Sequence, residues 1–150
     1  MTDNQYMAHV WLSRMWDKDI EINQLEVRRD KIISSLSGIG NYDAERVPSA
    51  GNDNGTEIKN IEYAMISEQI ENKLKEISKE NIRTIEAIEK VNDPFLRSML
   101  YAWYINRLQW REIVKIYNYE KSQVYQYRNK ALDAVFKYIP QEEAAIYVDN

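Results

Sequence analysis

The sequence has no cysteine and a single histidine, His9, among its 150 residues. Without cysteine there are no disulfides, no thiolate nucleophiles and no cysteine-based metal sites. One histidine leaves little scope for zinc binding or histidine-dependent catalysis, so we interpret His9 as a packed or surface residue. We therefore expect a protein that is not an enzyme and that uses no metal and no cofactor.

Long apolar runs and a signal sequence are also missing. No stretch approaches the roughly 18 apolar residues that a membrane span needs, and the first residues, Met1 to Gln5, show no basic and then apolar segment. Glycine (4) and proline (3) are scarce, while 44% of residues are hydrophobic and 29% are charged. This composition is typical of a folded, helix-rich protein, and we expect it to be all-α and cytoplasmic, with no membrane partner.

Charge and aromatic residues are distributed unevenly. Residues 1–94 contain 12 basic and 18 acidic side chains, whereas residues 95–138 contain eight basic and three acidic ones. The last twelve residues, 139–150, add three acidic side chains, and 11 of the 17 aromatic residues lie within 95–138. A basic module next to an acidic one often separates a surface that binds a polyanion from one that binds protein.

The first 92 residues predict two long helices. Residues 6–36 have no proline or glycine, and their apolar spacing fits either a weak coiled-coil seam or an amphipathic helix packed on one neighbour. Residues 37–56 hold all four glycines and predict a linker. Thr56 is a plausible N-cap for an acidic helix from Glu57 to about Val91. The two helices could fold back as an antiparallel hairpin, or the same seam could pair two chains as a homodimer.

The sequence Asn92-Asp93-Pro94 marks a boundary. Asp93 can cap a helix in which Pro94 takes the first position, where a missing N–H does no harm. Three shorter helices are expected after it, over residues 95–106, 110–117 and 121–138. Ile139-Pro140 ends the last helix, because the residue before a proline disfavours helical dihedrals.

Residues 110–128 have the spacing of a helix-turn-helix. Ile113 and Tyr117 lie one turn apart on the inner side of the first helix. Asn118 falls at the turn, where the chain commonly needs a positive φ that asparagine tolerates, and Tyr119 is expected to fill the angle between the helices. The inner stripe of the second helix consists of Val124, Tyr127, Ala131 and Val135.

The other side of the second helix carries hydrogen-bond donors suited to phosphates and base edges in a major groove. Gln126 and Asn129 suit bidentate contacts to adenine, and Lys121 suits guanine or phosphate. Arg111, Arg128 and Lys130 flank this side and suit phosphates, which position a protein on DNA without specifying sequence. The predicted DNA-binding residues are Arg111, Lys121, Ser122, Gln123, Tyr125, Gln126, Arg128, Asn129 and Lys130.

Two residues depart from the usual helix-turn-helix pattern. Val114 occupies an inner position that usually holds a very small residue, which predicts a slightly wider helix separation. Glu120 stands where a Ser or Thr cap is usual, and Ser122 could cap the helix instead, two residues later. We expect Trp103, Tyr104 and Trp110 to pack in the core, because small domains favour bulky aromatic residues for burial.

The C-terminal region resembles region four of bacterial sigma factors and, more closely, phage-encoded late-transcription regulators of the RinA/ArpU type. Upstream, the long N-terminal helix, the element Arg46-Val47-Pro48-Ser49 and the Glu-rich helix ending at Asp93-Pro94 extend the likeness. The residues that carry it most specifically are Arg97, Leu100, Trp103, Tyr104, Leu108, Trp110 to Ile113, Tyr119, Gln123 to Tyr125, Ala131 and Leu132.

This resemblance implies a DNA-binding activator of phage late genes that acts at promoters with host RNA polymerase. The expected fold is all-α, with an N-terminal long helical hairpin followed by a sigma-region-four-like helix-turn-helix domain. The expected parts are an N-terminal amphipathic helix (1–36), a linker (37–56), a long acidic helix (57–92), a DNA-binding domain (93–139) and an acidic tail (140–150).

Two other functions fit the same pattern. A small-terminase-like packaging protein also joins a DNA-binding helical module to an oligomerising hairpin, although such proteins usually place the DNA module first. A protein-only adaptor could grip a host factor with the hairpin alone. The element Arg46 to Ser49 could be a simple connector or a tether that contacts DNA or polymerase.

Overall fold

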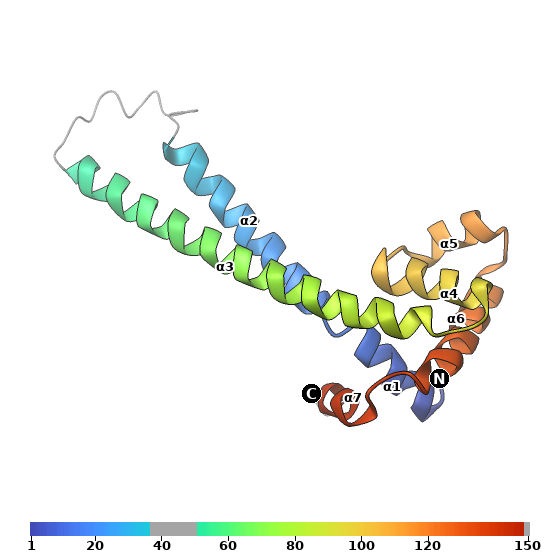
Figure 1. The fold of residues 1–150 in the computed structure, drawn as a ribbon. Helices are drawn as coiled ribbons and strands as arrows, with labels where there is room; N and C mark the ends of the chain where they lie inside the picture. The colour runs from blue at the N-terminus through green and yellow to red at the C-terminus, as the bar shows by residue number, and fades with distance from the viewer. Residues whose placement is uncertain (37–50, 149–150) are drawn as a thin grey trace. The chain divides into compact units, whose positions relative to one another are not determined.

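The computed structural model describes residues 1–36 and 51–148, and within these ranges it contains helices and no strands (Figure 1). The all-α prediction is confirmed. The chain divides into two compact units. We call Trp16–Ser78 the hairpin unit, and Met1–Met15 together with Lys79–Asn150 the head unit. No helix in the described ranges has the length and apolar character to cross a membrane.

The hairpin unit consists of α2 (Trp16–Leu36) and the part of α3 (Gly51–Glu89) that precedes Lys79. Ion pairs join Lys18 to Glu76, Glu21 to Lys73 and Arg28 to Glu62. Residues further along α2 therefore pair with residues that come earlier in α3. The two helices are therefore antiparallel, as the hairpin prediction requires. The buried apolar side chains of this unit are Ile22, Ile32, Ile66, Ile70 and Ile77.

The prediction of one continuous helix through residues 6–36 is wrong. The structure has α1 (Asp3–Leu12) and then α2, with turns between them at residues 13–15. Near the break, Ser13 Oγ donates to the carbonyl of His9 (2.8 Å) and Arg14 Nη1 donates to the carbonyl of Trp11 (2.7 Å). The same carbonyls also accept from the backbone N–H groups of Ser13 (3.0 Å) and Arg14 (3.2 Å), so side-chain and backbone donors share them at the end of α1.

The expected start of the acidic helix is also wrong. α3 begins at Gly51, so residues 51–56 belong to the helix and Thr56 is not its N-cap. Extending an existing helix fixes one residue for each added hydrogen bond and avoids the cost of nucleation, which explains how glycine-containing sequence joins it. Residues 37–50, including the element Arg46 to Ser49, lie outside the described residues.

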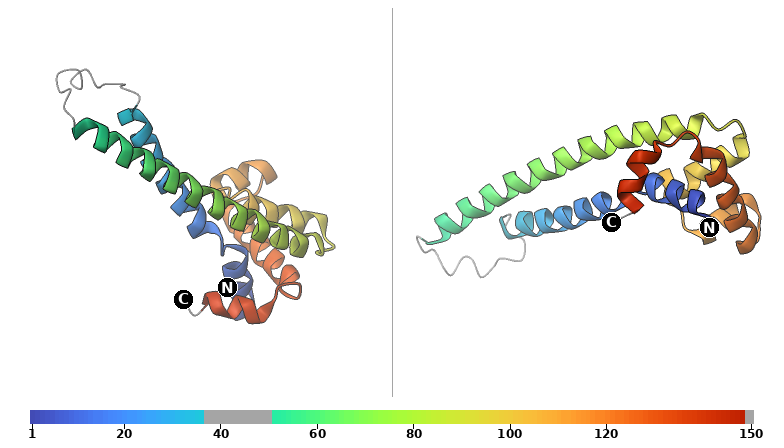
Figure 2. Two further views of the ribbon diagram at one scale, coloured as in Figure 1. Left: turned by 60° about the vertical axis from the view of Figure 1, so that its left-hand side comes forward. Right: turned by 90° about the horizontal axis from the view of Figure 1, so that it is seen from below.

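The head unit contains the predicted helix-turn-helix and five further helical pieces among the described residues. α6 packs against α1, α4 and α5, while α7 packs against α1, and Figures 1 and 2 show α1 and α7 side by side. Its helices, besides α1 and the end of α3, are α4 (Pro94–Leu100), the π-helix η2 (Tyr101–Ile105), α5 (Trp110–Tyr117), α6 (Lys121–Phe136) and α7 (Gln141–Val148). Its largest fully buried apolar side chains are Trp11, Ile88, Met99, Leu100, Ile113, Leu132, Val124 and Val135.

The start of α4 has the predicted capping geometry at Asp93 and Pro94, although both lie within the head unit. The Asp93 carboxylate accepts hydrogen bonds from the first backbone N–H groups of α4, at 2.9 and 3.3 Å, and Pro94 is the first helical residue. Arg97 then donates to the carbonyls of Val91 (2.6 Å) and Asn92 (3.2 Å). These contacts fasten the end of α3 to the start of α4.

Residues 141–148, predicted as part of an acidic tail, form α7 and pack into the head unit. Ala144 is fully buried. The Glu143 carboxylate accepts from both terminal nitrogens of Arg83 (2.9 and 2.7 Å) and from the indole N–H of Trp11 (3.2 Å). The Arg83 hydrogen bonds hold the pKa of Glu143 below its usual value. This acidic segment is therefore a structural part of the unit.

A buried arginine ties α1 to α3 inside the head unit. The Arg14 side chain is fully buried and lies 3.8 Å from the centre of the Trp11 ring. It donates to the backbone carbonyl of Glu80 (2.9 Å), to the Glu80 carboxylate (3.0 Å) and to the Thr84 hydroxyl (2.9 Å). Buried charge is tolerated when it is paired and hydrogen-bonded in this way.

Candidate functional site

The helix-turn-helix consists of α5 and α6 joined by residues 118–120. Asn118 has φ 58° and ψ 43°, the left-handed conformation that the sequence predicted. Ile113 and Val124 are fully buried where the two helices meet. The Tyr119 ring lies 5.2 Å from the Tyr127 ring and 6.0 Å from the Phe95 ring, so it packs against α4 as well as α6.

α6 begins directly after the turn, with Glu120 as its N-cap residue. The backbone N–H of Glu120 donates to Gln123 Oε1 at 2.9 Å. The alternative start with Ser122 as the cap is therefore not observed. Gln123 uses its amide oxygen for this contact, which leaves its NH2 group to donate elsewhere.

The outward side of α6 is open. Ala131 and Val135 on its inward side are fully buried. Six of the nine predicted DNA-binding residues are exposed, and three are half-buried. The exposed ones are Arg111, Lys121, Ser122, Gln123, Gln126 and Lys130, and the half-buried ones are Tyr125, Arg128 and Asn129.

The three half-buried residues form one cluster with Trp103 of η2. The Arg128 guanidinium lies 4.9 Å from the Tyr125 ring centre and 5.2 Å from that of Trp103. It also donates to Asn129 Oδ1 at 3.3 and 3.4 Å. Asn129 could pair with adenine only by sharing or releasing this carbonyl contact, so Gln126 is the better placed candidate for reading a base.

Several basic side chains of residues 95–138 lie over aromatic rings. The Lys121 ammonium is 4.4 Å from the Trp110 ring centre, that of Lys130 is 5.2 Å from Tyr127, and that of Lys137 is 5.1 Å from Tyr138. A ring attracts a cation through its quadrupole but carries no net charge. These contacts therefore orient positive charge without cancelling it.

Among the described residues, no ion pair involves Arg111, Lys121, Arg128 or Lys130. Sequence reasoning expected Trp103 and Trp110 in the core, yet both are half-buried and hold cations. Basic and aromatic residues are both enriched in residues 95–138, and this feature of the sequence could have predicted contacts between cations and tryptophan rings.

Half-buried His9 of α1 and buried Tyr104 of η2 form a polar pair. His9 Nδ1 is 2.8 Å from the Tyr104 hydroxyl, and the two rings meet edge to face. Burial lowers the pKa of His9, and the positive charge of Arg128 lowers it further. Burial also raises the pKa of the Tyr104 hydroxyl. These shifts favour the uncharged forms of both groups at neutral pH.

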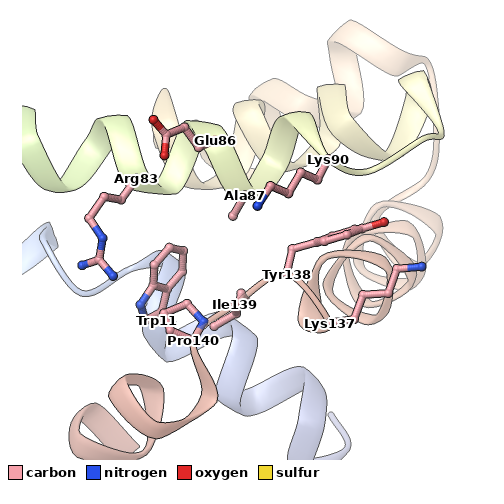
Figure 3. A pocket seen from close by; sticks show the side chains of 9 residues that line it. All are labelled: Trp11, Arg83, Glu86, Ala87, Lys90, Lys137, Tyr138, Ile139 and Pro140. Carbon is pink, nitrogen blue, oxygen red and sulfur yellow. The ribbon is translucent and has the colours of Figure 1, made fainter.

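A groove of about 410 Å³ lies between α1, the end of α3 and the turn from α6 to α7. Figure 3 shows Arg83 beside Trp11 at one end of this groove. Arg83 is already paired with Glu143 and Glu80, which raises its pKa. In residues 1–36 and 51–148 no cluster of three or more His, Cys, Asp or Glu side chains is placed to hold a metal.

Comparison with known proteins gives a family but no described relative. The family model described as "Protein of unknown function (DUF1492)" matches residues 40–135, a range that includes all nine predicted DNA-binding residues. No curated protein and no solved structure matches the chain. The likeness to regulators of the RinA/ArpU type stays a prediction. Because the family model covers more than half of the sequence, the chain belongs to the DUF1492 family.

Proposed function

We propose that this protein binds duplex DNA with the outward side of α6 and regulates transcription. The observation that carries the proposal is the division of α6 into two sides. Val124, Ala131 and Val135 are fully buried on one side, while Lys121, Gln126 and Lys130 are exposed on the other. A helix held in this way by a helix-turn-helix can enter a major groove without rearrangement of its core.

Uncompensated positive charge supports the same function. The cations around α6 face aromatic rings and not carboxylates, so they can neutralise DNA phosphates and release counterions. Lys130, Arg128 and Arg111 are assigned to phosphates, and Lys121 to phosphate or guanine. Gln126 is assigned to a base edge, with Ser122, Gln123, Tyr125 and Asn129 as neighbours that shape the contact.

The regulatory part of the proposal comes from the resemblance to phage late-gene regulators. In that role the protein would act at a promoter with host RNA polymerase, inside the host cytoplasm. The helix-turn-helix would choose the site, and other surfaces would contact the polymerase.

The test is selection of binding sites from a random duplex library, followed by anisotropy measurements between 50 and 200 mM salt. We expect one enriched sequence, and affinity that falls steeply with salt. Gln126→Ala should cost about 1–3 kcal/mol on that sequence and relax the preference at one position. Lys130→Ala should weaken binding to all duplexes and reduce the salt slope by about 1.

Lys75→Ala is the matched control, because Lys75 is an exposed lysine of the hairpin unit whose side chain pairs with Glu71. It should leave DNA binding unchanged. Absence of binding at 50 mM salt would remove DNA as the ligand. Binding without sequence enrichment would contradict a promoter regulator and favour a packaging role. The enriched site, placed in a promoter, should change transcript yield when the protein is added to RNA polymerase.

A further inference from the structure

We infer that Trp110, Arg111 and Lys121 together form a binding site for one phosphate group of the DNA backbone. The inference rests on the proposed function and adds Trp110, a residue expected in the core, to the interface. Trp110 and Arg111 begin α5, and Lys121 begins α6. The site therefore joins both helices of the helix-turn-helix at one point.

Two cations share the Trp110 ring. The Lys121 ammonium lies 4.4 Å from the ring centre and the Arg111 guanidinium carbon lies 5.3 Å from it. Both side chains are exposed, and neither is ion-paired within the part of the chain that the structure describes. Like charges near one ring repel each other, so an anion bound close to both would relieve that repulsion.

A second tryptophan of the head unit also has two cations near its ring, and there an anion is already present. At Trp11, the guanidinium carbons of Arg14 and Arg83 lie 3.8 and 6.0 Å from the ring centre. The Glu143 carboxylate accepts from the Trp11 indole N–H (3.2 Å) and from Arg83 (2.7 and 2.9 Å), and it lies 4.0 Å from Arg14 Nε. A tryptophan with two cations therefore binds an oxyanion in this protein.

At Trp110 the corresponding oxyanion is not supplied by the chain. The Trp110 indole N–H has no hydrogen-bond partner among the described residues. The neighbouring Glu112 accepts a hydrogen bond from the backbone of Gln109 (3.3 Å), and Glu120 forms no ion pair with Lys121. An indole donor and two cations thus remain for an external phosphate, which offers oxygen acceptors as the Glu143 carboxylate does at Trp11.

The test compares the full chain with Trp110→Leu and Trp110→Phe on a duplex scanned with single neutral methylphosphonate linkages. On the wild-type protein, one linkage should reduce affinity about tenfold, since it removes the charge of the bound phosphate. Trp110→Leu should bind unmodified DNA about 3- to 30-fold more weakly and should lose sensitivity at that linkage. Trp110→Phe keeps a ring and should fall between the two.

A second readout follows the indole N–H signals of the four tryptophans by NMR. The Trp110 signal, identified by its absence in Trp110→Phe, should shift on titration with the duplex. Lys115→Gln, which changes an exposed α5 lysine, is the control and should keep the methylphosphonate pattern. Thermal unfolding shows whether each variant is folded. If Trp110→Leu does not fold, the comparison of Trp110→Phe with the wild type still tests the inference.

The outcomes separate the two proposals. If the wild-type chain binds no duplex, the proposed function fails and this inference fails with it. If DNA binding and the Gln126 and Lys130 effects are as expected, but the Trp110 variants keep the wild-type affinity and linkage pattern, this inference alone is wrong. An unshifted Trp110 signal at saturating duplex would also overturn it.

Discussion

Basic side chains are held differently in the hairpin unit and in residues 95–138. In the hairpin unit, lysines and an arginine meet carboxylates across the two helices. In residues 95–138, most lysine and arginine side chains with a described contact lie over aromatic rings. The hairpin pairs are Lys18–Glu76, Lys73–Glu21 and Arg28–Glu62. The ring contacts are Arg111–Trp110, Lys121–Trp110, Arg128–Trp103, Arg128–Tyr125, Lys130–Tyr127 and Lys137–Tyr138.

The two kinds of partner have different electrostatic results. A carboxylate orients a cation and also cancels its field, whereas a ring orients the cation and leaves the field intact. The number of lysines and arginines in a segment therefore says less about polyanion binding than the partners they have. By this measure the ion-paired cations of the hairpin unit contribute to folding, and the cations over rings in residues 95–138 are the ones available to the DNA that we propose as the ligand.

Arg14 lies over the Trp11 ring and also pairs with the Glu80 carboxylate. Its replacement should have the largest effect on stability. Arg14→Ala removes a fully buried side chain and its hydrogen bonds to Trp11, Glu80 and Thr84, so we expect a loss of about 3–5 kcal/mol in the free energy of unfolding. Urea unfolding would measure it. Arg28→Ala, at an exposed pair, is the control and should cost far less. A loss below about 1 kcal/mol for Arg14→Ala would mean that burial of this pair contributes little.

Removing three cations from each region tests the comparison directly. Changing Lys121, Arg128 and Lys130 to Gln should weaken DNA binding about a hundredfold at 0.1 M salt and reduce the salt slope by about 3. Changing the three hairpin cations Lys18, Arg28 and Lys73 to Gln should lower the stability of the hairpin and leave the salt slope unchanged. Anisotropy and thermal unfolding measure the two effects. Equal losses of DNA affinity in both variants would contradict the distinction.

The burial of His9, together with the charge of Arg128, should also make stability depend on pH. His9 titrates near pH 6.5 when unfolded, and burial, then the charge of Arg128, lowers its pKa in the folded state. Below about pH 6.5 the unfolded chain takes up this proton more readily, so stability should fall until the pH reaches the folded pKa. Because His9 is the one histidine in the sequence, His9→Asn should flatten the change in unfolding midpoint between pH 7.5 and 5.5. An identical slope in the variant would exclude His9 as the cause.

Replacing Tyr127 should have the smallest effect of these changes, and it tests whether an aromatic ring supports the position of a nearby cation. Tyr127→Leu removes the ring beneath Lys130, so DNA affinity should fall about two- to fivefold. Tyr127→Phe retains the ring and should bind as the wild type does. Because Tyr127 also packs 4.9 Å from the Phe95 ring, thermal unfolding must accompany the anisotropy measurement. If Tyr127→Phe weakens binding as much as Tyr127→Leu, the hydroxyl group and not the ring supports Lys130.

The parts of the fold that sequence predicts are those encoded by neighbouring residues. Asp93 and Pro94 define a helix start, Asn118 defines a turn, and spacings of three and four define the buried side of α6. The helix break at residues 13–15 was missed, since it accompanies contacts from Arg14 to Glu80 and Thr84, more than sixty residues away.

In the candidate site, too, the features set by neighbouring residues could be predicted, and those set by tertiary contacts could not. The exposed residues of α6 follow from helical periodicity, and six of the nine predicted side chains are exposed. The role of Trp110 could not be predicted, because it depends on α5 and α6 meeting so that Lys121 reaches a ring eleven residues earlier. The contact of Arg128 with Asn129 likewise depends on the rotamers of both side chains.

The bonds between Arg14 and Glu80 give the head unit the topology of a domain that carries an insertion. The chain departs at Met15 and returns at Lys79, and these two points are neighbours because the adjacent residues are hydrogen-bonded. A short glycine-serine bridge could therefore replace residues 16–78 without stretching the backbone. The shortened protein would keep the whole helix-turn-helix, and it would show which activities require the hairpin unit.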